Sequence, residues 1–497
     1  MATTDRRAGP APGATDTPSP HRRDTRLAAV ALAYAALQLC YAVAHMHLGW
    51  DESVYLSQVD PRHPAAYFSA PRSRGITLLV APVIAVTSST TALRVTLALL
   101  SSAALYAAFA VWQPLLGRAR VALAGLLFAG LWITVLSGPE VMPNLWVALA
   151  SVAAVGWFLR ARHDGPGRRR ALVALAASLA AVALLRAPDA GWLALPLLAV
   201  CAGVRQWRRP ATVAAVAGGL AAGGAQWVAE AYARFGGIGR RLSVSSGTEG
   251  GMGEHPGAGL RAAYRALNGP QLCRPCHIAG PSLTHALWWL LLPALTAAAC
   301  ALALTGRRRA RGAAVTLLPA ACALALAAPY LLLLDYSAPR FLLPAYALLA
   351  LPVADLALHA AGTARRGRAR LAVSVLLCAV LAAHLAVQDR ELRVNTADAR
   401  DTAVRYHRAA QELGRLGLTA PCLVTGPRAQ PVAYAAGCAS AQITGNNRSH
   451  SAADIVRRAS RIPTALLFDT KDPYLPSYAR DWRPHRLPGT DWLAYLP

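Results

Sequence analysis

The sequence carries little charge for its length. Only 15% of its 497 residues are Asp, Glu, Lys or Arg, whereas a soluble domain usually carries about 25%. Lysine is almost absent, because Lys471 is the only one. Glycine and proline follow no regular period, which excludes a collagen-like chain, and a hydrophobic content of 55% excludes a disordered one. This composition is too apolar for an ordinary soluble enzyme.

The basic residues nevertheless outnumber the acidic ones and give a formal net charge of +26. In a soluble protein this excess would indicate nucleic-acid binding. Here the arginines are divided among short loops between apolar runs, which argues against a nucleic-acid partner and indicates a polytopic membrane protein. The abundance of alanine and arginine is typical of a GC-rich, actinobacterial genome.

The apolar runs predict about eleven transmembrane helices. A spanning helix needs about 20 apolar residues, because unpaired backbone amides are not tolerated in lipid. The run at 75–88 is shorter and contains Pro82, so we expect an interfacial or re-entrant helix there. The expected spans are 27–48, 91–115, 121–137, 144–159, 171–186, 190–204, 211–231, 284–305, 313–334, 340–360 and 371–388.

The arginines also predict the orientation of the chain in the membrane. The N-terminal tail is basic, and so is every second loop after it. By the positive-inside rule these segments are cytoplasmic, so we expect a plasma-membrane protein whose C-terminal region is extracytoplasmic. The expected parts are a disordered cytoplasmic tail (1–26), a transmembrane domain (27–389) with external loops at 49–90, 137–144 and 232–283, and an extracytoplasmic domain (390–497).

Four cysteines fall in the predicted external regions, an even number that suits disulfides. Cys273 and Cys276 form a CxxC motif, which also occurs in zinc half-sites and redox pairs. No second CxxC exists and only His277 lies beside this one, so a structural Cys273–Cys276 disulfide is favoured. Cys422 and Cys438 are the second expected pair.

The C-terminal region alternates between predicted strands and helices. This alternation predicts a small α/β domain whose parallel strands are linked by helices. No GxGxxG follows the first strand, so a dinucleotide site is rejected. The domain could cover the mouth of an active site, hold an acceptor, or serve as a structural cap. The segments are helix 397–416, strand 422–426, helix 431–437, strand 440–444, helix 451–460 and strand 465–469.

Two carboxylates, Asp51 and Glu52, follow the first predicted span directly. Acidic residues at the membrane boundary are costly, which makes them candidates for function. The alternative is that they only cap the next helix, where carboxylates favour the positive end of the helix dipole.

Arginines near the external ends of the spans favour a functional role. The positive-inside bias makes such arginines unusual, and their planar donors suit phosphate oxygens. Carboxylates and arginines together suit a lipid-phosphate substrate and a proton acceptor. The alternative is structural ion pairing, of Arg186 with Asp189 and of Arg340 with Asp335. The arginines are Arg72, Arg74, Arg186 and Arg340.

Several segments together resemble a known family. A first span followed by WDESVY, a proline-containing loop with interfacial helices, a short second external loop and a late APRFLLPAY resemble the GT-C fold glycosyltransferases. That family includes the bacterial aminoarabinose transferase, protein O-mannosyltransferases and mycobacterial arabinofuranosyltransferases. The resemblance covers about 27–390 and is clearest at 45–160 and 335–350. It implies an extracytoplasmic active site, a polyprenyl-phosphate-linked sugar donor and inversion at the anomeric centre.

The resemblance also implies roles for particular residues. The acidic motif of the family's first external loop matches Asp51 as the general base, with Glu52 as the close alternative. The family's basic residue after the first interfacial helix matches Arg72 or Arg74, and the arginine before a late LLP segment matches Arg340. These guanidinium groups would stabilise the leaving phosphate.

The second external loop departs from the family pattern. Glu140 is present, but Asn144 stands where the family often has Asp. The sequence therefore allows a divalent metal at Asp51 and Glu140 without requiring one. Tyr55 and Tyr336 lie beside the proposed site residues and are expected to line it with Glu140, Asn144 and Asp189, although aromatic residues also belt any membrane interface.

The main prediction is therefore a membrane glycosyltransferase that moves a sugar from a polyprenyl phosphate to a hydroxyl of a glycan, lipid or protein acceptor. The alternative is a transporter or lipid-sugar flippase. Transporters usually have repeated halves and charged residues near mid-membrane, whereas this sequence shows no evident repeat and its spans are nearly free of charge. A protein that only anchors the C-terminal domain would not need eleven spans.

Overall fold

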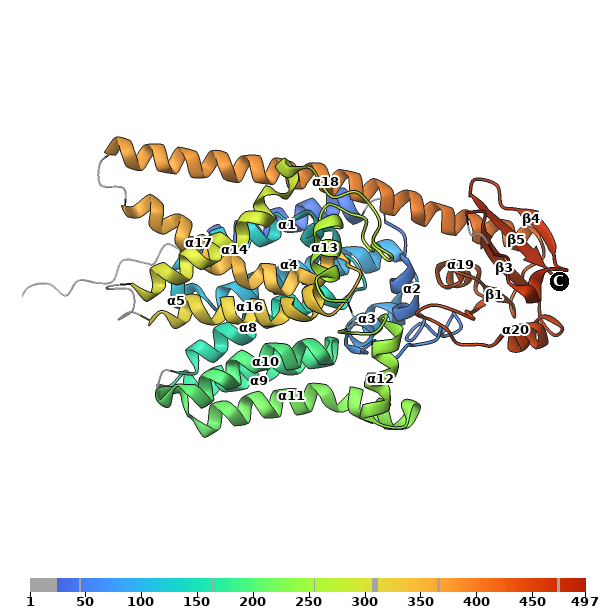
Figure 1. The fold of residues 1–497 in the computed structure, drawn as a ribbon, viewed down its shortest axis with the longest axis horizontal. Helices are drawn as coiled ribbons and strands as arrows, with labels where there is room; N and C mark the ends of the chain where they lie inside the picture. The colour runs from blue at the N-terminus through green and yellow to red at the C-terminus, as the bar shows by residue number, and fades with distance from the viewer. Residues whose placement is uncertain are drawn as a thin grey trace, which may run out of the picture.

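The computed structural model describes residues 25–43, 46–162, 165–253, 255–305, 312–363, 367–471 and 474–497. These residues form a bundle of helices with a small β-sheet at one end (Figure 1). The predicted tail 1–26 lies outside the described residues except for its last two. The polytopic α-helical class with a small C-terminal α/β domain is confirmed.

Seven helical segments are long and apolar enough to cross a membrane. Each coincides with one of the predicted spans, because these runs can bury their backbone amides only within a helix. They are α1 with η1 (Arg26–Leu37, Gln38–Val43), α4 (Thr90–Ala110), α11 with η3 (Pro210–Glu230, Ala231–Phe235), α14 (Leu283–Leu304), α16 (Ala314–Leu332), η4 with α17 (Pro339–Leu342, Leu343–Thr363) and α18 (Gly367–Arg415).

The four other predicted spans are helical too. The run 121–137 is divided at Leu131, whose backbone is extended, and the amide of Trp132 donates to Gln388 Oε1 at 3.0 Å. The short run at 75–88 is the separate helix α3 (Gly75–Val86). The four spans correspond to α6 (Arg118–Ala129) with α7 (Trp132–Ser137), α8 (Pro143–Arg160), α9 (Arg168–Leu185) and α10 (Ala187–Gly203).

Shorter helices lie in the connections between these elements. One of them, α2, carries the WDESVY sequence, and α12 and α13 lie in the predicted loop 232–283. The short helices are α2 (Trp50–Leu56), α5 (Gln113–Leu116), η2 (Arg205–Trp207), α12 (Ile238–Thr248) and α13 (Ala258–Arg265).

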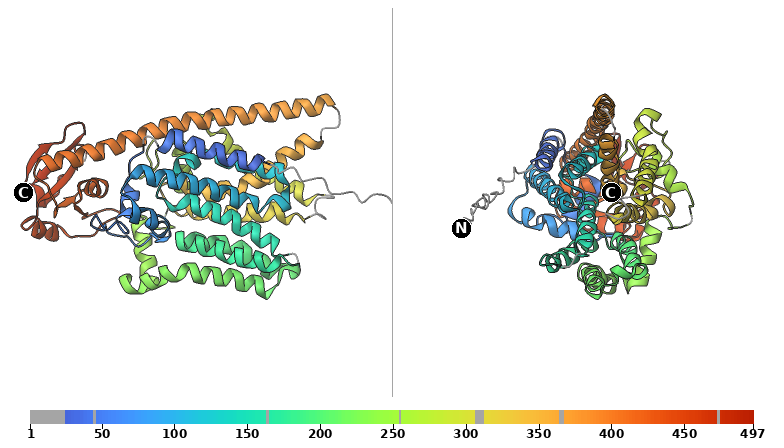
Figure 2. Two further views of the ribbon diagram at one scale, coloured as in Figure 1. Left: turned by 180° about the vertical axis from the view of Figure 1, so that it is seen from behind. Right: turned by 90° about the vertical axis from the view of Figure 1, so that its left-hand side faces the viewer.

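The long helix α18 joins the bundle to the C-terminal sheet without a break. It has 49 residues and runs along one side of the bundle to the sheet (Figure 2). The predicted domain boundary at 389/390 therefore falls inside a helix. The predicted helix 397–416 is the last part of the same element.

The C-terminal sheet has five strands in the order β2-β1-β3-β5-β4. As predicted, β1 pairs in parallel with β2 and β3, so that Val424 lies opposite Ser440 and Ala465. The sequence did not predict β4 and β5, which continue the sheet antiparallel. The elements are β1 (Leu423–Thr425), α19 (Ala429–Ala436), β2 (Ala439–Ala441), α20 (Ala452–Ala459), β3 (Thr464–Asp469), η5 (Ser477–Ala479), β4 (Arg483–Arg486) and β5 (Trp492–Leu496).

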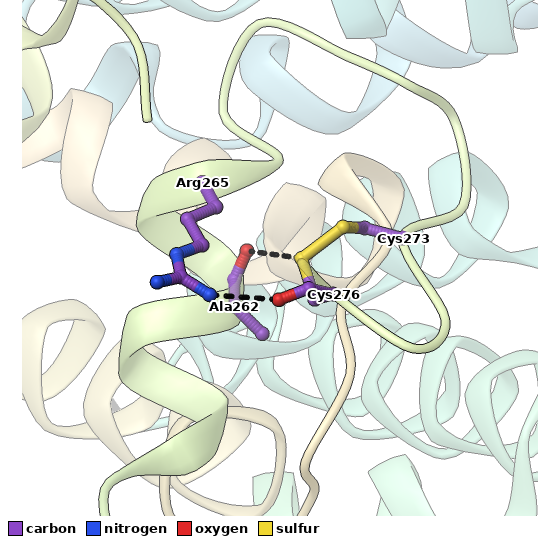
Figure 3. Close-up of a disulfide and its surroundings, with 4 residues drawn as sticks. All are labelled: Ala262, Arg265, Cys273 and Cys276. Atoms are coloured by element: carbon purple, nitrogen blue, oxygen red, sulfur yellow. Dashed lines mark hydrogen bonds between the residues drawn. A yellow bond between two sulfur atoms is a disulfide. The ribbon is translucent and has the colours of Figure 1, made fainter. Parts of the chain in front are cut away.

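Both expected disulfides are present. Cys422–Cys438 joins the residues before β1 and β2 in the core of the C-terminal domain. Cys273–Cys276 closes a turn whose Cys276 carbonyl accepts a hydrogen bond from Arg265 Nη1 at 2.8 Å (Figure 3). Each disulfide therefore stabilises a segment outside the apolar helices.

Helices α9 and α11 pack closely because glycines lie between them. A Cβ atom on Gly223 would come within 2.0 Å of the carbonyl oxygen of Ala180, and one on Gly219 within 2.5 Å of that of Ala176. Such small residues, four apart, let two helix backbones approach in a membrane. Gly224, the next residue, has nothing within 4 Å of its Cβ position.

We predict that Gly223→Leu separates α9 from α11 and lowers the free energy of unfolding by about 1–3 kcal/mol through overpacking. Thermal unfolding of the purified protein in detergent measures this change. Gly224→Leu is the matched control and should unfold close to wild type. Equal effects of the two substitutions would contradict the packing described here.

Candidate active site

Asp51 lies in the first turn of α2, immediately after the first predicted span. Its Oδ1 accepts a hydrogen bond from Arg72 Nη2 at 2.7 Å, and its Oδ2 accepts one from Arg340 Nη2 at 2.9 Å. About 28% of the Asp51 side chain remains exposed. Three residues that are far apart in the sequence therefore meet at one accessible carboxylate.

These residues line a cavity of about 1050 Å³ between the helix bundle and the C-terminal sheet. The cavity brings together all of the predicted catalytic, phosphate-binding and substrate-lining residues except Arg74. The residues brought together are Asp51, Glu52, Tyr55, Arg72, Glu140, Asn144, Arg186, Asp189, Tyr336 and Arg340.

Glu52 makes a very different set of contacts from its neighbour. It is only 4% exposed, and its two oxygens accept hydrogen bonds from the two Nη atoms of Arg94. The backbone amides of Gly49 and Val141 also donate to it, each at 2.7 Å. Successive side chains on a helix project about 100° apart, so α2 can direct Asp51 to the arginines and Glu52 into the protein.

Arg94 is a neighbour of the candidate site that the sequence did not single out. It lies in α4, within the predicted span 91–115, and is completely buried. Besides pairing with Glu52, it donates to the carbonyls of Pro139 at 2.7 Å and His47 at 2.8 Å. This arginine is an exception to the expectation of nearly uncharged spans, and a lone charge near the beginning of an apolar run was the available signal.

Arg340 is positioned by a hydrogen bond to the loop that contains the Cys273–Cys276 disulfide. Its Nη1 donates to the carbonyl of Gln271 at 2.9 Å, and the Cys273 amide donates to the carbonyl of Ser337 at 2.9 Å. Its Nε is buried and has no hydrogen-bond partner among the described residues. Arg340 pairs with Asp51 rather than with Asp335, so the alternative ion pair is not formed.

Arg72 is supported by aromatic rings. Its guanidinium lies 5.0 Å from the centre of the Tyr55 ring and 5.7 Å from that of Trp50. Its Nε donates to Ser69 Oγ at 3.3 Å. Tyr55 therefore both lines the cavity and supports the arginine that contacts Asp51.

Arg186 forms the ion pair that the sequence left as an alternative and also lines the cavity. Its Nε lies 3.2 Å from Asp189 Oδ2, and the Tyr330 hydroxyl donates to Asp189 Oδ1 at 2.6 Å. The guanidinium lies 5.5 Å from the centre of the Tyr330 ring. About 27% of the Arg186 side chain is exposed, so the pairing leaves it accessible.

Arg74 does not join the predicted cluster. Its Nη2 donates to Glu230 Oε1 at 2.8 Å, and its guanidinium lies 4.5 Å from the centre of the Phe68 ring. It directly precedes Gly75, the first residue of α3, where a Cβ would lie 2.6 Å from the carbonyl oxygen of Leu184. This packing fixes the start of α3 and leaves Arg74 beside Glu230 instead of Asp51.

Burial and the charges around the cavity shift the pKa values of Asp51 and Glu140 in opposite directions. Burial opposes ionisation of Asp51, but Arg72 and Arg340 outweigh it and hold the pKa of Asp51 below its usual value. Burial, followed by repulsion from Glu52, raises the pKa of Glu140 to about 8, although Arg340 opposes the shift. The arginines therefore favour the ionised form of Asp51, whereas burial and Glu52 favour the protonated form of Glu140.

The described part of the chain holds no group of three or more His, Cys, Asp or Glu residues arranged for a metal ion. Both Asp51 oxygens are already engaged by arginines. A metal at Asp51 and Glu140 stays a prediction.

Glu249 is a second cavity residue that the sequence analysis did not single out. It lines the cavity and accepts a hydrogen bond from the Tyr336 hydroxyl. The Arg274 guanidinium lies 4.4 Å from the centre of the Tyr336 ring. Burial, and then the charge of Glu249, raise the pKa of Tyr336. The signal available was an acidic residue within the predicted external loop 232–283.

No protein-family model matches the sequence. No curated protein matches it in sequence either. Among solved structures, the chain is similar to ArnT from Cupriavidus metallidurans bound to undecaprenyl phosphate, with a TM-score of 0.63 and 12% identity over 95% of this chain and 98% of that chain. It is also similar to the oligosaccharyltransferase AglB from Archaeoglobus fulgidus in complex with an inhibitory peptide and a dolichol-phosphate. That match has a TM-score of 0.55 and 13% identity over 90% of this chain and 69% of that chain.

These similarities show the fold. Both proteins have the GT-C fold of membrane glycosyltransferases, so the resemblance drawn from WDESVY and APRFLLPAY is confirmed at the level of the fold. The apo structure of ArnT from Cupriavidus metallidurans gives the same result, with a TM-score of 0.61 and 12% identity over 94% of this chain and 96% of that chain.

We predict that Glu52→Gln lowers the free energy of unfolding by about 3–5 kcal/mol, because it leaves the buried Arg94 without its counter-charge. Denaturant or thermal unfolding in detergent measures the loss. The control is Asp389→Asn, which breaks an exposed ion pair with Arg393 and should change stability little. A Glu52→Gln variant as stable as wild type would contradict a structural role for Glu52.

Proposed function

We propose that the chain is a membrane glycosyltransferase that moves a sugar from a polyprenyl-phosphate donor to an acceptor hydroxyl at the extracytoplasmic face. The observation that carries this proposal is the ionised carboxylate of Asp51, held between Arg72 and Arg340 at the wall of a large cavity. The similarity of the whole chain to a structure bound to undecaprenyl phosphate supports it.

The arginines provide the donor-phosphate site in this proposal. Arg72, Arg186 and Arg340 line one cavity, and each can direct further N–H groups toward a phosphate. The Nη2 of Arg340 that contacts Asp51 can also turn to a phosphate, whereas its buried Nε has no partner among the described residues. A phosphate that takes hydrogen bonds from Arg72 and Arg340 would loosen their hold on Asp51 and make its oxygens available to the acceptor.

Asp51 then acts as the general base. The acceptor hydroxyl oxygen attacks the anomeric carbon while its proton passes to Asp51. The bond between the anomeric carbon and the phosphate oxygen breaks, and its electron pair leaves on the polyprenyl phosphate, where the arginines stabilise the growing charge. Attack from the face opposite the phosphate inverts the anomeric centre.

The disulfides support the extracytoplasmic position of the site. Cys273–Cys276 lies in the loop that contacts Arg340, and Cys422–Cys438 lies in the C-terminal domain. Disulfides persist in oxidising compartments outside the cytoplasm. A cytoplasmic N-terminus and a plasma-membrane location, inferred from the arginine-rich loops, complete the proposed topology.

We predict that Asp51→Asn reduces sugar transfer at least 100-fold, in keeping with the loss of a general base. Purified protein in lipid nanodiscs, supplied with radiolabelled polyprenyl-phosphate sugars and envelope acceptors, gives the measurement. Asp335→Asn is the matched control, since Asp335 is an exposed carboxylate that does not contact Asp51. Undiminished transfer by Asp51→Asn, or lipid translocation by the wild type without any transfer, would contradict the proposal.

We predict that Arg72→Gln moves the acidic limb of the pH profile of kcat/KM to higher pH. The wild-type carboxyl is ionised at unusually low pH because Arg72 and Arg340 lower its pKa. Without Arg72, burial dominates more, the pKa of Asp51 rises and activity is lost sooner as the pH falls. Arg74→Gln is the control and should leave this limb in place, because Arg74 contacts Glu230 instead.

A further inference from the structure

The wall of the cavity opposite the bundle is built by the C-terminal sheet. Residues that follow β1 and β2, and residues within and after β3, line the same cavity as Asp51. The carboxyl ends of the three parallel strands therefore face the candidate active site. The lining residues from this region include Gly426, Pro427, Arg428, Gln442, Thr444, Asn446, Phe468, Tyr474 and Tyr478.

The strand order gives this edge a particular geometry. From β1 the chain passes through α19 to β2 on one side, and from β3 it passes through η5 to β4 at the opposite edge of the sheet. The segments leaving β1 and β3 thus diverge. In open α/β sheets a crevice forms outside the carboxyl ends of strands at such a point, and ligands bind there.

The side chains at this edge present neutral hydrogen-bonding groups. Gln442 is only 6% exposed, and its Nε2 donates to the carbonyls of Gly426 at 2.9 Å and Pro427 at 3.3 Å. These bonds fix the amide, and its Oε1 takes no hydrogen bond from any described residue. Asn446 is oriented by Arg274, whose Nη1 donates to its Oδ1 at 3.0 Å. Two preset amides therefore border the cavity.

Aromatic rings accompany these amides. Tyr474 is 85% exposed although it lines the cavity, so packing within the protein does not explain it. Tyr406, from α18, is buried, stacks on Trp492 at 5.7 Å and lines the same cavity. Fixed amides beside one exposed aromatic face, that of Tyr474, suit a ligand with many hydroxyls and apolar C–H faces.

This edge also lies next to the general base. Trp50, which immediately precedes Asp51, donates from its Nε1 to the carbonyl of Pro427 at 3.2 Å. The same carbonyl accepts the second hydrogen bond of Gln442. Through these hydrogen bonds the strand ends contact Trp50, the residue next to Asp51, so a molecule bound there would lie near Asp51.

We propose that the carboxyl edge of β1, β2 and β3 is the acceptor subsite and that it binds a saccharide. This inference rests on the proposed function and adds the chemical class of the acceptor. Of the nine lining residues named above, Arg428 alone is cationic, whereas a phosphate-bearing headgroup would call for several. The acceptor glycan binds through Gln442, Asn446 and Tyr474 and presents one hydroxyl to Asp51.

The test measures binding of neutral linear hexasaccharides of mannose, glucose and arabinose to the full-length protein in nanodiscs by native mass spectrometry. We expect saturable binding of at least one of them, weakened tenfold or more by Tyr474→Ala and by Gln442→Ala. Tyr232→Ala, at a tyrosine that is 66% exposed but outside the cavity lining, should bind as wild type does. The same hexasaccharide on a lipid anchor distinguishes a membrane-bound glycan from a free one, and binding of either form supports the proposal.

A second arm separates this inference from the proposed function. Decaprenyl phosphate should bind the wild type, Tyr474→Ala and Gln442→Ala equally. No hexasaccharide binding, binding unaffected by both substitutions, or displacement of the saccharide by a neutral peptide of equal mass would overturn the acceptor subsite. Failure of the wild type to bind decaprenyl phosphate would instead count against the proposed function.

Discussion

The contact between Glu52 and Arg94 is the constraint on which the candidate site depends. A charge as deeply buried as Arg94 requires a partner, because an unpaired one would cost several kcal/mol. Glu52 is that partner, and the backbone amides of Gly49 and Val141 complete its shell. Because the Glu52 side chain points into the protein, the helical geometry of α2 directs the Asp51 side chain to the arginines. One of two adjacent carboxylates thus holds the helix, while the other faces the cavity and its arginines.

Three separate parts of the chain deliver guanidinium groups to the same cavity, and each is held differently. Arg72 rests against Tyr55 and Trp50, Arg186 is paired with Asp189, and Arg340 is backed by the loop that contains Cys273. Aromatic support, ion pairing and a disulfide-closed loop each reduce the freedom of a long side chain. The positive charge near Asp51 is therefore fixed in advance of any ligand, which is what electrostatic stabilisation of a leaving phosphate requires.

The sequence predicts the helices well because lipid offers no hydrogen-bond partners to the backbone, so a long apolar run must form a helix. It cannot tell Arg72 from Arg74, since two arginines two residues apart in a loop are distinguished only by where Gly75 packs. It also misses Arg94, whose partner lies 42 positions away. The strand β4 reads RPHR and has no hydrophobic alternation, so only its pairing with β5 reveals it. The sequence becomes polar after the last predicted span, which suggests that the helix ends there. The helix α18 nevertheless continues, because a change to polar composition does not by itself end a helix.

The C-terminal sheet is joined to the bundle by α18, which is one continuous helix. A helix of 49 residues extends about 75 Å at 1.5 Å per residue, more than twice the thickness of about 30 Å of a bilayer's hydrocarbon. A continuous helix turns less freely than a flexible linker, so the position of the sheet follows the direction of α18. A tilt of α18 relative to the other helices, such as a thicker or thinner bilayer can impose, would therefore move the strand ends that line the cavity.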